Sequence, residues 1–378
     1  MNRDFQELIL ITLAKRGAFS HTLSDVEWTD VYREAVKQSL IGVCFAGIER
    51  LPAEQRPEKQ LLIEWFGQAE HIKRRNRLVS ARAAEVTELF AEAGFKSVVL
   101  KGQGVAVLYN LNVNLDLDLN VNKDDKGDNL NLEHYRQSGD IDLWVDGKRE
   151  NAIAFMKGKG WKVGKSVIHH TDVEIFKDVS VEIHHVPSFT YSPLRWRKYK
   201  RWFREQAKIQ IQLMDKSKGF AYPCIRFNAV YSLLHIFRHV FHEGVGLRQL
   251  MDYYFILEHT TPSDRREAIR TLRWLGLQRF AAAVMYVLVE CFEIGTDRLL
   301  CEPDAAAGRF LMNEIVSGGN FGKYDKHYLK VHQGSGIRLY VQNVRRLFRM
   351  VRYYPSEVLW APAWKVSHFV WRKLKGYS

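Results

Sequence analysis

The spacing of apolar residues changes twice along this chain of 378 residues, and the change limits the folds open to it. Residues 1–92 place apolar side chains at helical spacing. Residues 93–190 mix short apolar strands, glycine turns and a helix, and helical spacing returns after about residue 191. This order predicts an α+β protein, with a small mixed sheet in the middle of the chain and helical regions on both sides.

Four regions follow from this pattern. We predict an N-terminal helical region (1–92), an α/β core (93–190), a helical domain (191–322) and a basic C-terminal helical tail (323–378). The long helix that begins near Leu61 is expected to end at Gly94, because glycine commonly follows the last turn of a helix. Two further helices are expected around Tyr353–Pro355 in the tail.

A low-complexity insert occupies residues 110–131 of the core. Seven asparagines and five aspartates occur in these 22 residues, and leucine and valine alternate with polar residues inside it. Alternation favours a strand, whereas asparagine and aspartate are poor strand formers. We predict a hairpin arm or a mobile loop that separates the core into two parts.

The positive charge is concentrated in two segments. The net charge is +13, and the tail from Lys323 onward carries twelve Lys/Arg against two acids. The run Arg195–Lys208 carries seven basic residues against one acid, with aromatic residues between them. These aromatic rings either stack on nucleic-acid bases or form the buried face of an amphipathic helix, and we favour the second. The two segments predict contact with RNA or an anionic membrane surface.

The cysteines and the termini indicate the compartment. The four cysteines show no CxxC spacing and no dense framework, which favours a reducing environment. The N-terminal segment lacks the features of a signal peptide, and the longest apolar run is too short to span a bilayer. We expect a cytoplasmic protein.

The segment Gly139–Val145, with the sequence GDIDLWV, carries the strongest chemical signal. Asp140 and Asp142 are two residues apart on a predicted strand, so their side chains point to the same face. Two neighbouring carboxylates repel each other unless a cation lies between them, and a divalent metal is the simplest such cation. Gly139 before them permits a ligand to approach the backbone closely.

A third carboxylate lies on a later predicted strand. Glu182 belongs to VSVEIHH and shares one strand face with His184. Glu174 on the preceding strand is a rival, and we prefer Glu182. Three carboxylates on neighbouring strands are typical of two-metal phosphoryl transfer, in which one ion binds the triphosphate and the other activates the attacking hydroxyl.

The histidines of the C-terminal half suggest a second group. His235, His239 and His242 share one face of a predicted helix. A zinc site is one interpretation. The interpretation that we prefer is that this face packs on the core and lines the cleft together with Arg238.

These motifs resemble the polymerase-beta-like nucleotidyltransferase superfamily, and more narrowly its bacterial uncharacterised nucleotidyltransferase family. The matching blocks are LKGQG, SGDIDLWV, VEIHH and GVGLRQLMD, within roughly residues 96 to 255. The superfamily has a glycine motif at a helix start, an Asp-x-Asp and a third acid. Here these correspond to Gly102 and Gly104, to Asp140 and Asp142, and to Glu182.

Two features depart from the superfamily pattern. The glycine motif of the superfamily usually reads Gly-Gly or Gly-Ser, whereas this chain has Lys101-Gly102-Gln103-Gly104. The insert adds some twenty residues between the glycine motif and the acidic strand. The phosphate contacts and the access to the site are therefore expected to differ from the usual pattern.

The resemblance implies a magnesium-dependent enzyme that moves a nucleoside monophosphate from an NTP to an acceptor hydroxyl. Asp140, Asp142 and Glu182 would be catalytic and bind Mg²⁺, with Mn²⁺ as the alternative ion. The expected nucleotide contacts are Lys101, Gly102, Gly104, Arg136, Gly139 and Arg248. The alternatives are a non-catalytic nucleotide-binding protein of the same fold, and a protein that binds RNA or a membrane surface through its basic segments.

Overall fold

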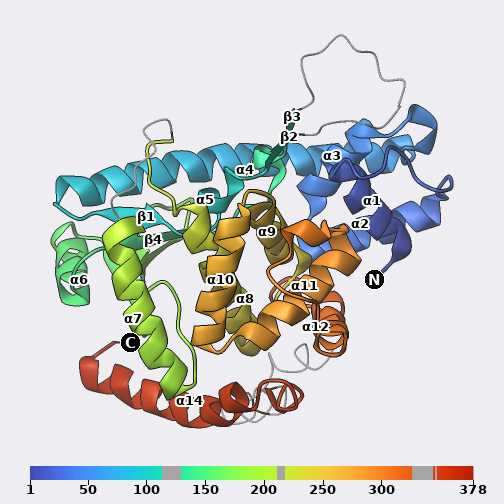
Figure 1. Ribbon diagram of the computed structural model, residues 1–378. Helices are drawn as coiled ribbons and strands as arrows, with labels where there is room; N and C mark the ends of the chain where they lie inside the picture. The colour runs from blue at the N-terminus through green and yellow to red at the C-terminus, as the bar shows by residue number, and fades with distance from the viewer. Residues whose placement is uncertain (113–128, 211–217, 326–343, 345–346, 378) are drawn as a thin grey trace.

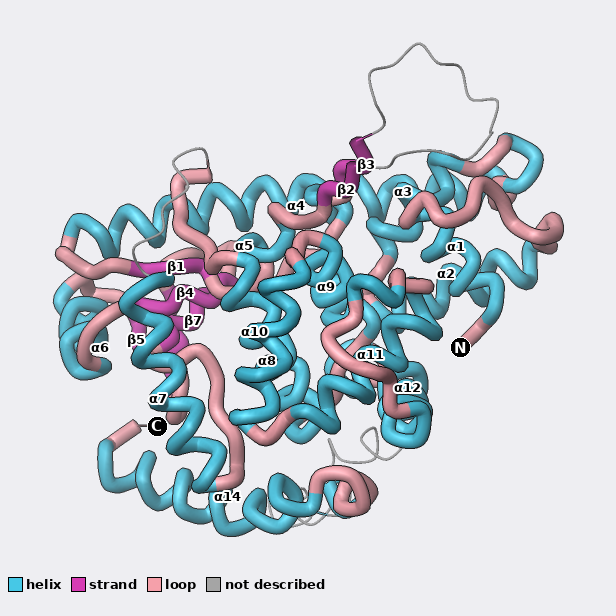
Figure 2. Tube along the Cα trace, in the orientation of Figure 1, coloured by secondary structure: helices cyan, strands magenta, loops and turns pink. Residues whose placement is uncertain are grey.

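The computed structural model describes residues 1–112, 129–210, 218–325, 344 and 347–377 of the chain (Figure 1). Helices form most of this structure, and a single five-stranded sheet lies beside the longest of them (Figure 2). The α+β fold class predicted from the sequence, a small mixed sheet with helices on both sides, is confirmed.

Four α-helices precede the sheet, with the bounds α1 (Arg3–Thr12), α2 (Asp25–Gln38), α3 (Ile41–Arg50) and α4 (Lys59–Glu92). A capping box starts α2, because Ser24 accepts a hydrogen bond from the Glu27 N–H and the Glu27 carboxylate accepts one from the Ser24 N–H. The end of α4 confirms the prediction: Gly94 follows the helix with a φ of +81°, a conformation that favours glycine.

Five strands form a mixed sheet in the order β1–β4–β7–β6–β5. Their bounds are β1 (Ser97–Val99), β4 (Ile141–Val145), β5 (Lys162–Ser166), β6 (His170–Glu174) and β7 (Val181–His184). β4 and β7 are parallel, whereas the other neighbours are antiparallel. The parallel register places Asp142 opposite Glu182. Two of the predicted acids thus lie side by side on adjacent strands.

Different helices cover the two faces of the sheet. On one face, Ile141 and Leu143 belong to a buried cluster that includes residues of α4 and α6 (Arg149–Gly158). On the other face, Trp144 stacks on Phe227 of α8 (Ile225–His242), with ring centroids 5.9 Å apart. Asp142 and Trp144 are two residues apart on β4, so Asp142 faces α8 as well.

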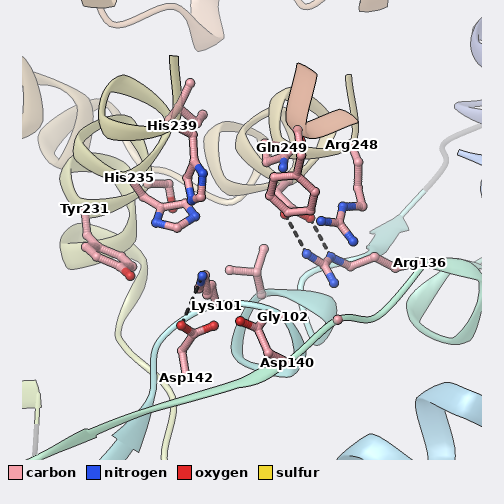
Figure 3. Close-up of a pocket in the computed structure, with 16 residues that line it drawn as sticks. Lys101, Gly102, Arg136, Asp140, Asp142, Tyr231, His235, His239, Arg248 and Gln249 are labelled. Carbon is pink, nitrogen blue, oxygen red and sulfur yellow. Dashed lines mark hydrogen bonds and ion pairs between the residues drawn. The ribbon is translucent and has the colours of Figure 1, made fainter. Parts of the chain in front are cut away.

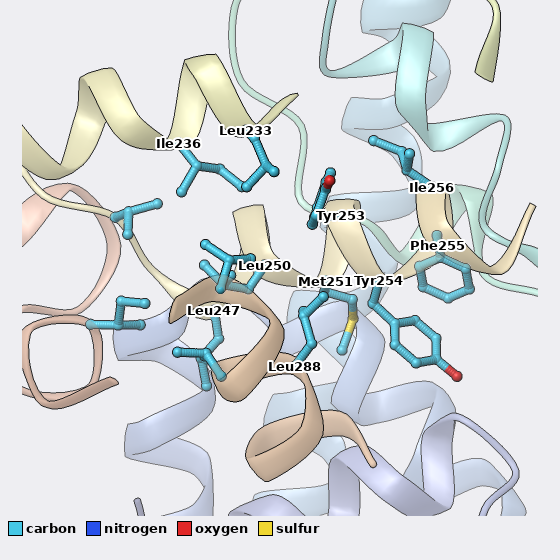
Figure 4. Packing of buried hydrophobic residues seen from close by; sticks show 14 of the residues in the cluster. Leu233, Ile236, Leu247, Leu250, Met251, Tyr253, Tyr254, Phe255, Ile256 and Leu288 are labelled. Atoms are coloured by element: carbon cyan, nitrogen blue, oxygen red, sulfur yellow. The ribbon is translucent and has the colours of Figure 1, made fainter. Parts of the chain in front are cut away.

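The C-terminal helices form the larger core. Besides α8, they are α7 (Pro193–Gln210), α9 (Leu247–Glu258), α10 (Pro262–Leu275), α11 (Gln278–Phe292), α12 (Ala305–Gly318) and α14 (Pro355–Lys375). Figure 4 shows side chains of α8, α9 and α11 packed around Leu250. Leu8 and Trp65 of the N-terminal helices belong to the same cluster. Both helical regions therefore share one core, and the division into four regions stays a prediction.

The basic run Arg195–Lys208 lies in α7 and has the amphipathic form that we favoured. Tyr199, Trp202 and Phe203 are buried, and Trp202 stacks on Phe227 at a centroid distance of 5.1 Å. These three rings are part of the core, so the alternative in which they stack on nucleic-acid bases is wrong. The exposed face of α7 keeps its cations, including Lys200, Arg201 and Arg204.

The insert begins and ends as a hairpin. β2 (Asn110–Asn112) pairs antiparallel with β3 (Asn129–Asn131), which agrees with the predicted arm at its base. The rest of the predicted arm, residues 113–128, lies outside the described residues. Most of the segment before Tyr353 in the tail also lies outside them, and α14 is the second of the two helices expected there.

None of the helices in the described ranges is both long and apolar enough to cross a membrane.

Candidate active site

Three carboxylates meet at one end of β4 and β7. Asp140 precedes β4, Asp142 lies within it, and Glu182 lies opposite on β7. One oxygen from each of the three lies within 4.8 Å of the others. The structure therefore brings together all three acids that were chosen from the sequence. The rival Glu174 is 67% exposed and pairs with Lys162 at 2.7 Å, away from this cluster.

Basic side chains surround the carboxylates. Lys101 Nζ lies 3.0 Å from Asp142 Oδ1, and His184 Nε2 lies 2.7 Å from the same oxygen. His184 Nε2 also lies 3.3 Å from Glu182 Oε2, and His170 Nδ1 lies 3.1 Å from that oxygen. The place of His184 on the Glu182 face was expected. The contact of His170 was not, because it depends on the pairing of β6 with β7.

These contacts keep Asp142 and Glu182 ionised. Burial alone would raise the pKa of Asp142, but the Lys101 ammonium and the His184 ring lower it below its usual value. Burial is likewise outweighed at Glu182, where His184, Lys101 and His170 lower the pKa to about 2. Burial would lower the pKa of His184, and its two carboxylate partners raise it instead. The cluster is thus negatively charged at neutral pH, with cations beside it.

The carboxylates fit a divalent metal ion. Asp142 Oδ2 is buried and has no hydrogen-bond partner among the described residues, although its other oxygen has two basic neighbours. A buried carboxylate oxygen without a partner is costly, and a bound cation would satisfy it. Three carboxylates offer the hard oxygen ligands that Mg²⁺ and Mn²⁺ prefer.

The glycine motif lies directly beside this cluster. Gly102 has φ +60° and ψ −110°, a conformation that side chains disfavour. A Cβ atom on Gly104 would lie 2.2 Å from the Val99 carbonyl oxygen, so the chain after β1 packs too closely for any other residue. The helix expected after this motif is a single turn, α5 (Gln103–Ala106). Its dipole is therefore small, and a phosphate would depend on side chains for its charge balance.

A pocket extends from the acids to helices α8 and α9 (Figure 3). It has about 600 Å³ of space, its open mouth included. From the sheet side it is lined by Lys101, Gly102, Gly139, Asp140 and Asp142. Tyr231 and His235 of α8 and Arg248 of α9 lie opposite (Figure 3). A ligand in this pocket would contact Asp140, Asp142 and the cations together, whereas Glu182 is not among the lining residues.

Arg136 and Arg248 both line the pocket, but their contacts differ. Arg136 Nε and Nη2 donate to the two oxygens of Asp252 at 2.6 and 2.8 Å, and Tyr109 donates to the same carboxylate at 2.6 Å. Arg248 Nη1 donates to the Gln137 carbonyl at 2.9 Å, and its buried Nε has no partner among the described residues. Of the two predicted nucleotide contacts, Arg248 has the donors available for a phosphate.

The histidine face of α8 lines the cleft, as we preferred. His235 and His239 border the pocket, and Arg238 Nη2 lies 2.9 Å from His239 Nε2. Burial and Arg238 lower the pKa of His239 to about 4. Among the described residues, no group able to hold a metal includes His235, His239 or His242. The structure therefore offers no support for the zinc interpretation.

A second cavity borders Glu182 from the other side. It lies between β6, α8 and α14, and Asp172, Arg238, Trp364, His368 and Arg372 are among its lining residues. Phe189 stacks on Trp364 with ring centroids 4.7 Å apart, and Trp364 stacks on His368 at 4.6 Å. No sequence motif indicated this cavity, because its walls come from segments far apart in the chain.

Comparison with known proteins agrees with the resemblance seen in the sequence. A family described as uncharacterised nucleotidyltransferase matches residues 24–132 and 128–293. A search of curated proteins found no match to the chain. The two matched segments include the glycine motif, the three acids and the α9 motif, and they cover well over half of the 378 residues. The chain therefore belongs to the uncharacterised nucleotidyltransferase family.

Proposed function

We propose that the protein is a magnesium-dependent nucleotidyltransferase, which moves a nucleoside monophosphate from an NTP to an acceptor hydroxyl and releases pyrophosphate. The observation that carries the proposal is the meeting of Asp140, Asp142 and Glu182 within 4.8 Å, with a buried Asp142 oxygen that lacks a partner among the described residues. Mn²⁺ is the alternative ion.

Each side chain has a role in this proposal. Asp140, Asp142 and Glu182 hold the metal ions, which when bound supply positive charge to the phosphates and make the acceptor hydroxyl a better nucleophile. Arg248 binds a phosphate of the triphosphate through its available donors. His184 orients Asp142 and Glu182 through its Nε2. Lys101 pairs with Asp142 in the free protein and lines the pocket in which the triphosphate would bind.

The reaction then proceeds by in-line displacement at phosphorus. The acceptor oxygen forms a bond to the α-phosphorus, and the bond from this phosphorus to the bridging oxygen of pyrophosphate breaks. The hydroxyl proton hydrogen-bonds to Glu182 and passes to solvent, because basic neighbours of Glu182 favour its ionised form. Positioning and charge stabilisation supply most of the rate enhancement in such reactions.

Replacing Asp140 tests this function with the least risk to folding. Asp140 is partly exposed, whereas Asp142 is buried in ion pairs. We expect Asp140→Asn to lower Mg²⁺-dependent pyrophosphate release by roughly 100-fold or more, the scale of losing one preorganised electrostatic contact. Binding of the four NTPs with Mg²⁺, measured by calorimetry, identifies the nucleotide for the assay.

The matched control is Glu174→Gln, an exposed carboxylate of the same sheet that lies away from the cluster. It should leave both binding and turnover unchanged, and both variants should melt within a few degrees of the parent protein. Equal turnover in Asp140→Asn and in the parent protein would show that the metal site is assigned to the wrong residues.

A non-catalytic nucleotide-binding protein of the same fold is the second candidate. The observation that favours it is the Lys101–Asp142 ion pair, which balances one acid of the cluster without a metal. In this case NTPs bind, the Arg248→Gln variant binds them more weakly, and no acceptor yields pyrophosphate. Pyrophosphate release with any acceptor decides for the enzyme.

RNA binding through the basic segments is a third candidate, carried by the exposed cations of α7. With Tyr199, Trp202 and Phe203 buried, this contact would be mainly electrostatic and insensitive to base sequence. Binding that falls steeply with salt and survives Asp140→Asn would favour it.

A further inference from the structure

The helix α14 has one buried face and one uncovered face. Its inner face packs against the rest of the protein: Glu357, Val358 and Ala361 are 2%, 1% and 0% exposed. The Glu357 carboxylate accepts hydrogen bonds from the Thr190 hydroxyl and the Tyr191 N–H. These contacts hold the helix at the edge of the molecule opposite α4 (Figure 1).

The outer face of α14 is almost entirely apolar. Its large side chains are exposed by 48–82%: Leu359, Trp360, Val366, Phe369, Val370 and Leu374. Leu359, Val366, Val370 and Leu374 are separated by seven, four and four residues, which aligns them along one side of the helix. Six of the fourteen exposed large hydrophobic side chains in the described part of the chain lie on this helix. Such a concentration marks a contact surface.

Positive charge accompanies the apolar face. Lys373 and Lys375 are exposed near the end of α14. The whole tail from Lys323 onward carries a net charge of +10. Arg195 of α7 lies 3.3 Å from Glu357, which places the cation-rich α7 next to α14. An apolar helix face bordered by lysine and arginine is typical of helices that lie in the plane of an anionic membrane surface.

Other occupants fit this surface less well. A second copy of the chain would bring two strongly basic tails together, and like charges repel. RNA offers no apolar surface to cover leucine and valine side chains, since proteins bind it through phosphates, stacked bases and hydroxyls. An anionic lipid surface fits both features, because its acyl region would contact the apolar face and its negatively charged headgroups would attract the lysines.

We propose that the outer face of α14 docks on an anionic lipid bilayer and lies in its interface without crossing it. The helix spans 21 residues, Pro355–Lys375, and its inner face remains on the protein. This proposal does not depend on the nucleotidyltransferase activity, because it rests on the exposure and charge of a surface that the proposed reaction does not use.

Vesicle co-sedimentation of the full chain tests the proposal. The probes are vesicles of phosphatidylcholine alone and of phosphatidylglycerol with phosphatidylcholine at roughly 1:3. We expect binding to the anionic vesicles to be about tenfold tighter or more, and to weaken as salt is raised. Val370→Ser/Leu374→Ser should weaken it about tenfold by removing apolar contact, and Lys373→Gln/Lys375→Gln should weaken it by a similar factor.

Two exposed apolar residues elsewhere provide the control. Val26 on α2 and Ile63 on α4 are 72% and 59% exposed. The double variant Val26→Ser/Ile63→Ser should bind vesicles as the parent protein does, and the melting temperatures should show that all variants fold. Three results would overturn the proposal: no preference for anionic vesicles, full binding by Val370→Ser/Leu374→Ser, or a dimer that this variant abolishes while vesicle binding is absent.

Discussion

Individual charges explain why the acid cluster is stable in the free protein. Asp142 is 1% exposed, and two basic side chains contact one of its oxygens. Strand alternation in the sequence predicted that Asp140 and Asp142 share a face, and the motif VEIHH predicted Glu182 as the third acid. The partners Lys101 and His170 were harder to predict than His184, because they reach these acids from the ends of other strands. Such pairings depend on the register of the sheet.

The two arginines of the pocket provide a prediction at the same scale. Arg136→Gln should lower the free energy of unfolding by about 3–5 kcal/mol, because it leaves Asp252 buried without its bidentate partner. Arg248→Gln should change stability by only about 1 kcal/mol, since one hydrogen bond to a carbonyl is lost. Urea unfolding of both variants measures this difference.

NTP binding should be weakened more by Arg248→Gln, the variant that loses less stability, than by Arg136→Gln. Arg248→Gln should weaken binding about tenfold or more if its guanidinium contacts a phosphate, because charge-assisted contacts are strong. Asp252→Asn provides a second test of the Arg136 pair and should destabilise the protein as Arg136→Gln does. Equal losses of stability for Arg136→Gln and Arg248→Gln would show that the Arg136–Asp252 pair stabilises the protein no more than the contact of Arg248 with the Gln137 carbonyl.

Among the elements, the helix α4 was easier to predict than the edge strand β5. The helix α4 and its end at Gly94 follow from apolar spacing and one glycine. The strand β5 was missed, because its sequence KVGKS has little apolar alternation and it lies at the edge of the sheet. The helix at the glycine motif is the single turn α5, in which Gly104 packs closely against the Val99 carbonyl of β1.

The contact of the sheet with α8 depends on a stack of aromatic rings. Phe227 is 1% exposed and stacks on both Trp144 of β4 and Trp202 of α7. Phe227→Ala should therefore lower the free energy of unfolding by about 3–5 kcal/mol, the usual cost of such a cavity. Phe66→Ala, at a residue that is 50% exposed, is the matched control and should cost much less. Similar losses in both variants, measured by urea unfolding, would argue against this packing.

For the whole molecule, buried histidines link stability to pH. Burial lowers the pKa of His169, of His185 to about 2 and of His239 to about 4. The folded protein keeps these rings neutral, whereas the unfolded chain takes up protons below about pH 6.5. The contribution of these histidines to the free energy of unfolding is therefore fully present above this pH. It decreases as the pH falls, because their pKa values are lower in the folded protein than in the unfolded chain. His184 has a raised pKa, so its contribution to the free energy of unfolding increases as the pH falls.

We expect the free energy of unfolding to fall between about pH 7 and about pH 5. Each neutral buried histidine contributes at most about 1.4 kcal/mol per pH unit below its unfolded pKa, and His184 offsets part of the total. Urea unfolding at both pH values measures the slope. His185→Gln should reduce it, whereas His134→Gln, at an exposed residue, should not. A stability that is equal or higher at about pH 5 would contradict this account.

The two faces of α14 have a thermodynamic consequence for the molecule as a whole. The inner face contributes Trp364, His368 and Arg372 to the cavity that borders Glu182, and the outer face is the apolar surface. One helix thus lines the cavity with one face and carries the proposed lipid-docking surface on the other. If a ligand at either surface shifts α14, the two binding events are coupled, and the coupling is reciprocal. A molecule that fills the cavity then changes the affinity of the protein for lipid by some factor, and lipid changes the affinity for that molecule by the same factor.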